Sequence, residues 1–230
     1  MKLKFLTLLL AATAMTAACS DDDENTGPEG EARVRVVHAS PDAPEVDVLV
    51  DGATVLSDVP YLAASDYLEV APGSRNLAVN AAGTATTVID ADVSLVDGAD
   101  YTVIAGGLLA DIEPIVLQDD NSAPAGGLAR VRAVHGAASA PAVDIYVTAP
   151  GADLAALTPA LTGVEFGDVA DYIEAPAGDY QVRVTPAGTK TVVIDSGTLA
   201  LESGQVRTAI AVDAPGGGAP FDLLLLEDLN

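Results

Sequence analysis

A sequence pattern that occurs twice constrains the fold of this chain more than any other feature. Residues 32–38 read Ala-Arg-Val-Arg-Val-Val-His, and residues 129–135 read Ala-Arg-Val-Arg-Ala-Val-His. The correspondence continues further along both copies, since Asp66 and Tyr67 recur as Asp171 and Tyr172. A repeat of this length, about 100 residues, predicts two domains that share one fold.

Each copy has the periodicity of β-strands. Short apolar runs, many of them β-branched, alternate with polar residues and are separated by turns that contain Gly, Pro, Asp and Asn. In the first copy we expect strands near residues 32–38, 46–51, 66–70, 75–80, 85–90, 100–105 and 113–117, with counterparts in the second copy. Seven short strands per copy predict an all-β chain with two tandem immunoglobulin-like β-sandwich domains.

The repeat also sets the expected domain boundaries. The first sandwich should span residues 32–118 and the second residues 129–230, with a linker rich in Gly and Pro over residues 119–128. The second copy carries an insertion of 8 residues near residues 149–159, because the offset between the copies grows from 97 to 105 there. Insertions of this kind are tolerated in surface loops.

The N-terminus has the organisation of a secretory signal. Lys2 and Lys4 precede an apolar run over residues 5–15, and small residues follow at 16–18. The apolar run has about 11 residues, whereas a helix that crosses a bilayer needs about 20. We therefore expect residues 1–18 to be a signal peptide that is cleaved off, with residues 19–31 left as a short, acidic, disordered tether.

Cys19, the only cysteine, lies where the signal ends. The segment Ala17-Ala18-Cys19 resembles the bacterial lipobox, although Thr16 stands where Leu is usual. The resemblance implies a covalent diacylglycerol on Cys19 as a membrane anchor, and no other cofactor is expected. The alternative is ordinary cleavage and a soluble protein, secreted or periplasmic.

The residues after the cysteine indicate a destination. Ser20, being other than Asp, resembles lipoproteins that are sorted to the outer membrane. Residues 21–24, Asp-Asp-Asp-Glu, resemble the acidic surface-export tag of Bacteroidota-type lipoproteins, although they also suit a solvated spacer. We expect an exported, lipid-anchored protein of the outer membrane or cell surface.

The charge excludes one class of partner. The sequence has 34 acidic and 10 basic residues, a formal net charge of −24, and Lys2 and Lys4 would be removed with the signal. A surface this acidic repels phosphate backbones, so no nucleic-acid partner is expected. The glycine pairs and triplet at 106–107, 126–127 and 216–218 lack nucleotide-binding motifs, so no nucleotide is expected either.

Two pairs of residues at matched repeat positions are predicted to form ion pairs. If the strands near 32–38 and 46–51 are neighbours in one sheet, Arg35 lies opposite Asp47, and Arg132 lies opposite Asp144 in the second copy. Strand alternation places Arg35 on a solvent-exposed face. Tyr67 and Tyr172, also matched, are expected to pack in the sandwiches with hydrogen-bonded hydroxyl groups.

The two histidines, His38 and His135, also occupy one repeat position. We expect each to end the first strand on the core side and to bond backbone groups of the following turn. A triad of His38, Ser40 and Asp42 is rejected, because the second copy has Ala and Ser in place of the last two. One histidine per domain cannot complete a transition-metal site, and neighbouring aspartates lack the ligand spacing of a calcium loop. No catalytic or metal-ligating residue is therefore predicted.

Part of the pattern resembles a known family. Residues 33–48 read Arg-Val-Arg-Val-Val-His-Ala-Ser-Pro-Asp-Ala-Pro-Glu-Val-Asp-Val and are followed by Asp66-Tyr67 and by Tyr-Thr-Val at 101–103. They resemble the secreted bacterial and archaeal family called domain of unknown function 4397 (DUF4397). The second copy departs from the family pattern at 137–139. The resemblance covers both copies and implies extracytoplasmic β-sandwich modules, often on lipoproteins, with no established activity.

These observations predict a cell-envelope lipoprotein that is not an enzyme and that serves adhesion, scaffolding or envelope structure through an unknown protein or envelope partner. The alternative is a lipoprotein that binds a peptide, a saccharide or Ca²⁺. Few aromatic residues are available to stack on a sugar, which disfavours a saccharide but not a peptide. A pocket lined by Tyr61, Tyr67 or Tyr101 would favour this alternative.

Overall fold

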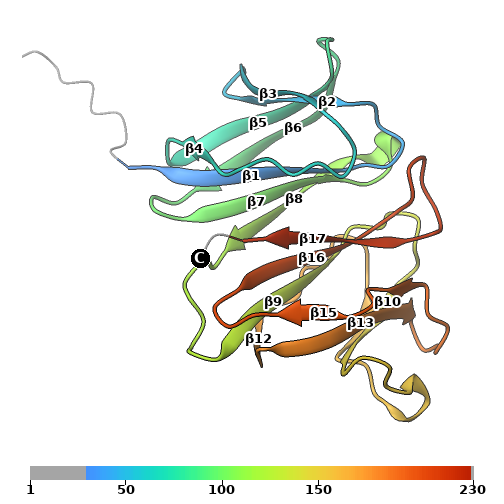
Figure 1. Ribbon diagram of the computed structural model, residues 1–230. Helices are drawn as coiled ribbons and strands as arrows, with labels where there is room; N and C mark the ends of the chain where they lie inside the picture. Colours follow the sequence, from blue (N-terminus) through green and yellow to red (C-terminus); the bar gives the residue numbers. More distant parts are fainter. Residues whose placement is uncertain (1–29, 229–230) are drawn as a thin grey trace, which may run out of the picture.

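The chain folds into four stacked β-sheets, two in each domain (Figure 1). The structure, a computed structural model, describes residues 30–228. These residues form strands, turns and two short 3₁₀ helices, and they contain no α-helix. The prediction of an all-β chain with tandem sandwich domains is confirmed.

The first domain has eight strands. Their bounds are β1 (Ala32–Ala39), β2 (Val46–Val50), β3 (Ala53–Val59), β4 (Leu68–Val70), β5 (Gly73–Ala81), β6 (Thr87–Leu95), β7 (Asp100–Gly106) and β8 (Glu113–Asp119). One sheet has the order β4-β1-β7-β8 and the other β3-β2-β5-β6. The 3₁₀ helix η1 (Leu109–Asp111) lies between β7 and β8.

The second domain repeats this arrangement. Its strands are β9 (Leu128–His135), β10 (Val143–Thr148), β11 (Leu161–Val164), β12 (Ile173–Pro176), β13 (Gly178–Pro186), β14 (Ile194–Asp195), β15 (Leu199–Leu201), β16 (Val206–Val212) and β17 (Asp222–Glu227). The sheets have the orders β12-β9-β16-β17 and β11-β10-β13-β14, with β15 also paired to β13. The predicted insertion is the connection between β10 and β11, which contains η2 (Leu154–Ala156).

One strand of the first domain was missed. Strand β3 is an edge strand whose residues are exposed except for Leu56 and Val59, and its pairing with β2 is irregular. Asp58 has a positive φ of 53°. An edge strand with little buried surface lacks the apolar alternation by which strands are recognised in a sequence.

The outer sheet of the first domain packs on one face of β1. Val34 and Val36 lie in a buried cluster with Leu77 of β5 and with Tyr101 and Val103 of β7. This face was correctly predicted to be buried, because successive residues of a strand point to opposite faces.

The other face of β1 is buried as well, against the second domain. A single cluster joins Val37, Ile104 and Leu117 of the first domain to Val134 and Ile210 of the second. In Figure 1 the sheet with β1, β7 and β8 lies directly on the sheet with β16, β17 and β9. The prediction that this face of β1 is exposed to solvent is wrong, since alternation separates two faces but does not identify what covers the second.

Strand β8 ends at Asp119 and β9 begins at Leu128, so a short connection joins the two middle sheets. The signal peptide (1–18), Cys19 and most of the acidic tether (19–31) lie outside the described residues, which begin at Gly30. Within residues 30–228, no helix has the length and apolar character needed to cross a membrane.

Candidate functional site

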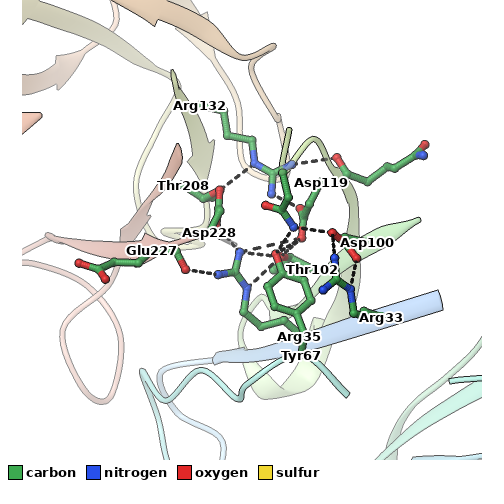
Figure 2. A network of polar contacts seen from close by, with 12 residues as sticks. Arg33, Arg35, Tyr67, Asp100, Thr102, Asp119, Arg132, Thr208, Glu227 and Asp228 are labelled. Atoms are coloured by element: carbon green, nitrogen blue, oxygen red, sulfur yellow. Dashed lines mark hydrogen bonds and ion pairs between the residues drawn. The ribbon is translucent and has the colours of Figure 1, made fainter. Parts of the chain in front are cut away.

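The two middle sheets enclose a buried network of charged residues (Figure 2). Arg35 of β1 points from the first domain into the interface, and its side chain is only 4% exposed. Its Nη2 donates to Asp228 Oδ1 of the second domain at 2.5 Å. Its Nη1 donates to the carbonyl oxygen of Glu227 at 3.0 Å, and its Nε and Nη2 donate to the Thr102 hydroxyl at 3.1 and 2.8 Å. This guanidinium group is therefore well supplied with acceptors.

Arg132 of β9 makes the same contacts in the opposite direction. Its Nη2 donates to Asp119 of the first domain, and its Nη1 donates to the carbonyl oxygen of Gln118 at 3.1 Å. Its Nε donates to the hydroxyl of Thr208 at 2.8 Å. Each arginine thus bonds the threonine of its own domain and the carboxylate of the other.

The two threonines complete the exchange. Thr102 Oγ1 donates to Asp119 Oδ2, and Thr208 Oγ1 donates to Asp228 Oδ2, both at 2.7 Å. Each aspartate therefore receives a proton donor from its own domain and a guanidinium group from its neighbour. Hydrogen bonds of this kind satisfy charges that would be costly to bury alone.

A tyrosine covers each arginine. The ring centre of Tyr67 lies 4.8 Å from Arg35 Cζ, and that of Tyr172 lies 4.7 Å from Arg132 Cζ. The Tyr67 hydroxyl donates to Asp119 at 2.6 Å, while the Tyr172 hydroxyl donates to Asp228 at 3.3 Å. Burial raises the pKa of both phenols, so both remain protonated donors at neutral pH.

Other polar contacts lie outside this network. Arg33 binds Asp100 through two hydrogen bonds of 2.6 and 2.7 Å, and Asn121 of the interdomain connection donates to the same carboxylate at 2.7 Å. Tyr61 donates across the interface to the carbonyl oxygen of Asp213 at 2.6 Å, and burial raises the pKa of Tyr61 to about 12. The bond from Tyr61 to Asp213 thus joins the two domains at a second place, apart from the buried network.

The predicted pairs of Arg35 with Asp47 and of Arg132 with Asp144 are wrong. Strands β1 and β2 lie in different sheets, and β1 pairs in parallel with β7 instead. Asp47 accepts from the backbone N–H groups of Asp58 and Gly83, both at 3.0 Å. Asp144 accepts from the equivalent turns, through Gly163 and Gly188. The prediction assumed that these two successive strands are neighbours in one sheet, but the chain crosses from one sheet to the other between them.

The prediction for the histidines is confirmed. His38 is fully buried at the end of β1, and its Nε2 bonds the carbonyl oxygen of Pro44 at 3.1 Å. Because this carbonyl can only accept, Nε2 carries the proton and Nδ1 accepts from Ser40 N at 3.4 Å. Burial lowers the pKa of His38. Nε2 of His135 bonds the carbonyl oxygen of Pro141 at 3.2 Å, whereas the buried Nδ1 of His135 has no hydrogen-bond partner among residues 30–228.

Asp42 does not join His38 and Ser40 in a triad, since its carboxylate accepts from the backbone N–H of Leu109 at 2.7 Å. Within residues 30–228, no three histidine, cysteine or acidic side chains are grouped so that they could hold a metal ion. The geometry of the buried network suits a structural role, because its carboxylates and guanidinium groups bind one another.

An open groove runs beside the network. It has a volume of about 530 Å³, and it is lined by Arg33, Arg35, Ala64, Ser65, Asp66, Tyr67, Glu69, Leu225, Leu226 and Glu227. Residues of both domains and charges of both signs thus border one depression at the domain junction.

The comparison with protein families identifies the chain. The model of the family described as Domain of unknown function (DUF4397) matches residues 5–49, 32–146 and 147–230. The chain belongs to the DUF4397 family. The overlapping matches agree with tandem copies of the DUF4397 domain, as the resemblance had implied.

Other known proteins add little to this identification. No curated protein matches the chain. A leucine-rich repeat protein from Bacteroides thetaiotaomicron VPI-5482 is 14% identical, with a TM-score of 0.21 over 83% of this chain and 27% of that one. A structure described as alpha-glucan binding by a streptococcal virulence factor is 12% identical, with a TM-score of 0.25 over 78% of this chain and 92% of that one. Scores this low carry no argument about this DUF4397 protein.

The sequence reasoning missed the acidic half of the network. Asp119 ends β8 and Asp228 directly follows β17, and each is the last residue of a similar tripeptide, Leu-Gln-Asp at 117–119 and Leu-Glu-Asp at 226–228. This short recurrence was the available signal. The signal is weak, because the two tripeptides are not separated by either of the offsets, 97 and 105, that relate the earlier parts of the two copies.

Proposed function

We propose that this protein is a lipid-anchored lipoprotein of the bacterial cell envelope that has no enzymatic activity, and that its two sandwiches serve as one scaffolding or adhesion module of fixed geometry. The reciprocal Arg35–Asp228 and Arg132–Asp119 contacts carry the proposal. These contacts lie in an interface that also contains an apolar cluster shared by the two domains.

The physical argument concerns the orientation of the domains. Domains joined by a small polar interface move relative to one another, whereas a large apolar interface holds them together. The shared cluster supplies apolar contact, and the buried charges penalise any displacement, because a shifted guanidinium group would lose its carboxylate without gaining water. A module that presents partner-binding faces at a fixed orientation to one another benefits from such an interface.

The charge-bearing residues of the interface support the absence of catalysis. Arg35, Arg132, Asp119 and Asp228 bind one another and have side chains that are at most 4% exposed, so little of their surface is left for a substrate. Catalytic groups, in contrast, must contact a reacting atom.

The anchor is tested by metabolic labelling with an alkyne fatty acid, comparing the wild-type chain with Cys19→Ala and with the matched control Ser20→Ala. We expect label and membrane fractionation for wild type and Ser20→Ala, and neither for Cys19→Ala. An unlabelled wild-type protein in the soluble fraction would overturn the anchor.

Chemical crosslinking on intact cells, followed by identification of the crosslinked proteins, tests the scaffolding role. A chain that crosslinks to no envelope component would contradict that role.

A second candidate function is peptide binding at the domain junction, favoured by the groove of about 530 Å³ beside Tyr67. A tyrosine ring with charges of both signs around it suits a short polar peptide. Ala64 lines this groove and is exposed, so Ala64→Trp would fill it without disturbing the buried network. Binding of a tryptic peptide pool that is lost in Ala64→Trp supports this function, and equal retention by both proteins argues against it.

A further inference from the structure

The two domains share a topology but differ in the size of three interior residues. In the first domain, Val36, Val70 and Val103 are buried together, each at most 8% exposed. Strand register identifies their counterparts. Ala32 pairs with Val70 as Ala129 pairs with Ala175, and Val36 pairs with Val103 as Ala133 pairs with Ala209. Three valines of the first core are therefore alanines in the second, namely Ala133, Ala175 and Ala209.

A fourth position loses a larger group. Tyr101 pairs with Val34 and is buried, and its hydroxyl accepts from Val96 N at 3.1 Å. Its counterpart, by register with Val131, is Arg207. The guanidinium group of Arg207 binds the exposed Glu227 at 2.7 Å. The ring that helps to fill the first core therefore has no equivalent in the second.

The wall of the second sandwich is also interrupted. Strand β6 runs without a break along β5 in the first domain, from Thr87 to Leu95. In the second domain the corresponding chain forms two short strands, β14 and β15, which are separated by residues 196–198. Gly197 in this gap has a φ of 62°, a left-handed conformation that interrupts an extended strand.

The missing volume remains as a cavity of about 170 Å³. Ala133, Ala175 and Ala209 all line it, together with Ile145, Val182 and Leu201. Val147 and Ile173 lie at its border and are 46% and 50% exposed, which is unusual for large aliphatic side chains. In the first domain their counterparts, Val50 and Leu68, are partly buried.

Three polar residues line the cavity, namely Arg132, Asp171 and Tyr180, and none of them has a free donor to offer a ligand. The guanidinium group of Arg132 is bound on the opposite face of β9, in the interdomain network. The Tyr180 hydroxyl donates to the carbonyl oxygen of Pro176 at 2.8 Å. Asp171 contributes an acidic group to the lining, and the net charge of the chain is −24. The site therefore repels anions and offers no donor for a carboxylate.

We infer that this cavity binds an uncharged hydrocarbon group about the size of one benzene ring. Apolar cavities of about 150 Å³ in proteins stay dry and take up benzene, so the size is sufficient. The ligand would enter past Val147 and Ile173 and would replace the side-chain atoms that fill the first domain. This site is separate from the groove beside Tyr67 and does not depend on the proposed function.

The experiment uses benzene as the probe and the full chain carrying Cys19→Ala, so that no attached acyl group competes. The matched variant adds Ala133→Val, Ala175→Val and Ala209→Val, which restores the residues of the first domain. With benzene in about tenfold excess over its Kd, we expect Tm to rise by about 3 °C for the chain with the alanines and to stay constant for the filled variant. An equal rise in both would overturn the inference.

Methyl NMR locates the ligand without relying on the filled variant. Benzene should shift the signals of Ile145 and Val182 and leave those of Val48 and Leu77, their counterparts in the first domain, unchanged. Hexanol should bind at least about tenfold more tightly than hexanoate, because the acidic surface repels the carboxylate. Shifts confined to the first domain, no shifts at saturating benzene, or equal binding of hexanol and hexanoate would each overturn the inference.

Discussion

Arg35 of the first domain donates to Asp228 of the second across 2.5 Å, and Arg132 repeats this contact in the reverse direction with Asp119. The two domains are therefore related by an exchange in which each provides one arginine and one aspartate. Because all four side chains are buried, the exchange determines how sensitive the interface is to substitution.

Removing one member of this exchange should be costly. Arg35→Met leaves Asp228 buried without its guanidinium partner, and we expect the free energy of unfolding to fall by about 3–5 kcal/mol. The double variant Arg35→Met with Asp228→Leu should recover much of that loss, because no unpaired charge remains. Urea unfolding of the single and double variants measures both quantities. A double variant that is no more stable than Arg35→Met would contradict this account.

The two tyrosines provide a matched pair of hydroxyl groups. Tyr67→Phe removes a donor 2.6 Å from Asp119, whereas Tyr172→Phe removes one 3.3 Å from Asp228. Hydrogen bonds to charged acceptors contribute about 1.5–3 kcal/mol, and long ones contribute less. We expect Tyr67→Phe to be the more destabilising of the two in thermal or urea unfolding, and the reverse order would refute the role assigned to Tyr67.

Stability should depend on pH through His38. Burial lowers the pKa of His38 below its usual 6.5, so the unfolded chain binds a proton at a higher pH than the folded one. The contribution is therefore complete above about pH 6.5 and decreases as the pH falls through the folded pKa. Urea unfolding at about pH 7.5 and pH 5.5 should give a lower free energy at the lower pH, and His38→Gln should reduce that difference. An unchanged difference in His38→Gln would assign the effect to other groups.

Asp47 should act independently of Arg35. Its carboxylate accepts from two backbone N–H groups, and Asp47→Ala should lower the free energy of unfolding by about 1 kcal/mol. In a double-mutant cycle with Arg35→Met, we expect a coupling energy within about 0.5 kcal/mol of zero. A larger coupling energy would instead support the cross-strand ion pair of Arg35 with Asp47 that strand alternation predicts.

Chelation should leave the fold unchanged. Residues 30–228 contain no group of three metal-ligating side chains, so we expect the same unfolding midpoint with and without EDTA. A lower midpoint in EDTA that returns on addition of Ca²⁺ would instead support the calcium-binding alternative.

The sequence by itself determined the features of this protein that depend on neighbouring residues. Alternation along 32–38 identified a strand and its core face, and His38 bonds Pro44, which is only six positions away. The twofold occurrence of the pattern established that two copies of one fold are present. Such features follow from a period of two residues and from short-range hydrogen bonding, and they require no knowledge of distant contacts.

Only the tertiary structure decided which surfaces meet. The partners of Arg35 are Thr102 in β7 and Asp228, which is 193 positions away, and neither distance is encoded in local alternation. Parallel pairing of β1 with β7 placed β2 in the opposite layer, which separated Arg35 from Asp47. The same register shows that Val103 of the first core corresponds to Ala209 of the second, which is one of the size differences between the two cores. A strand alone specifies two faces, and what covers each face depends on how the sheets stack.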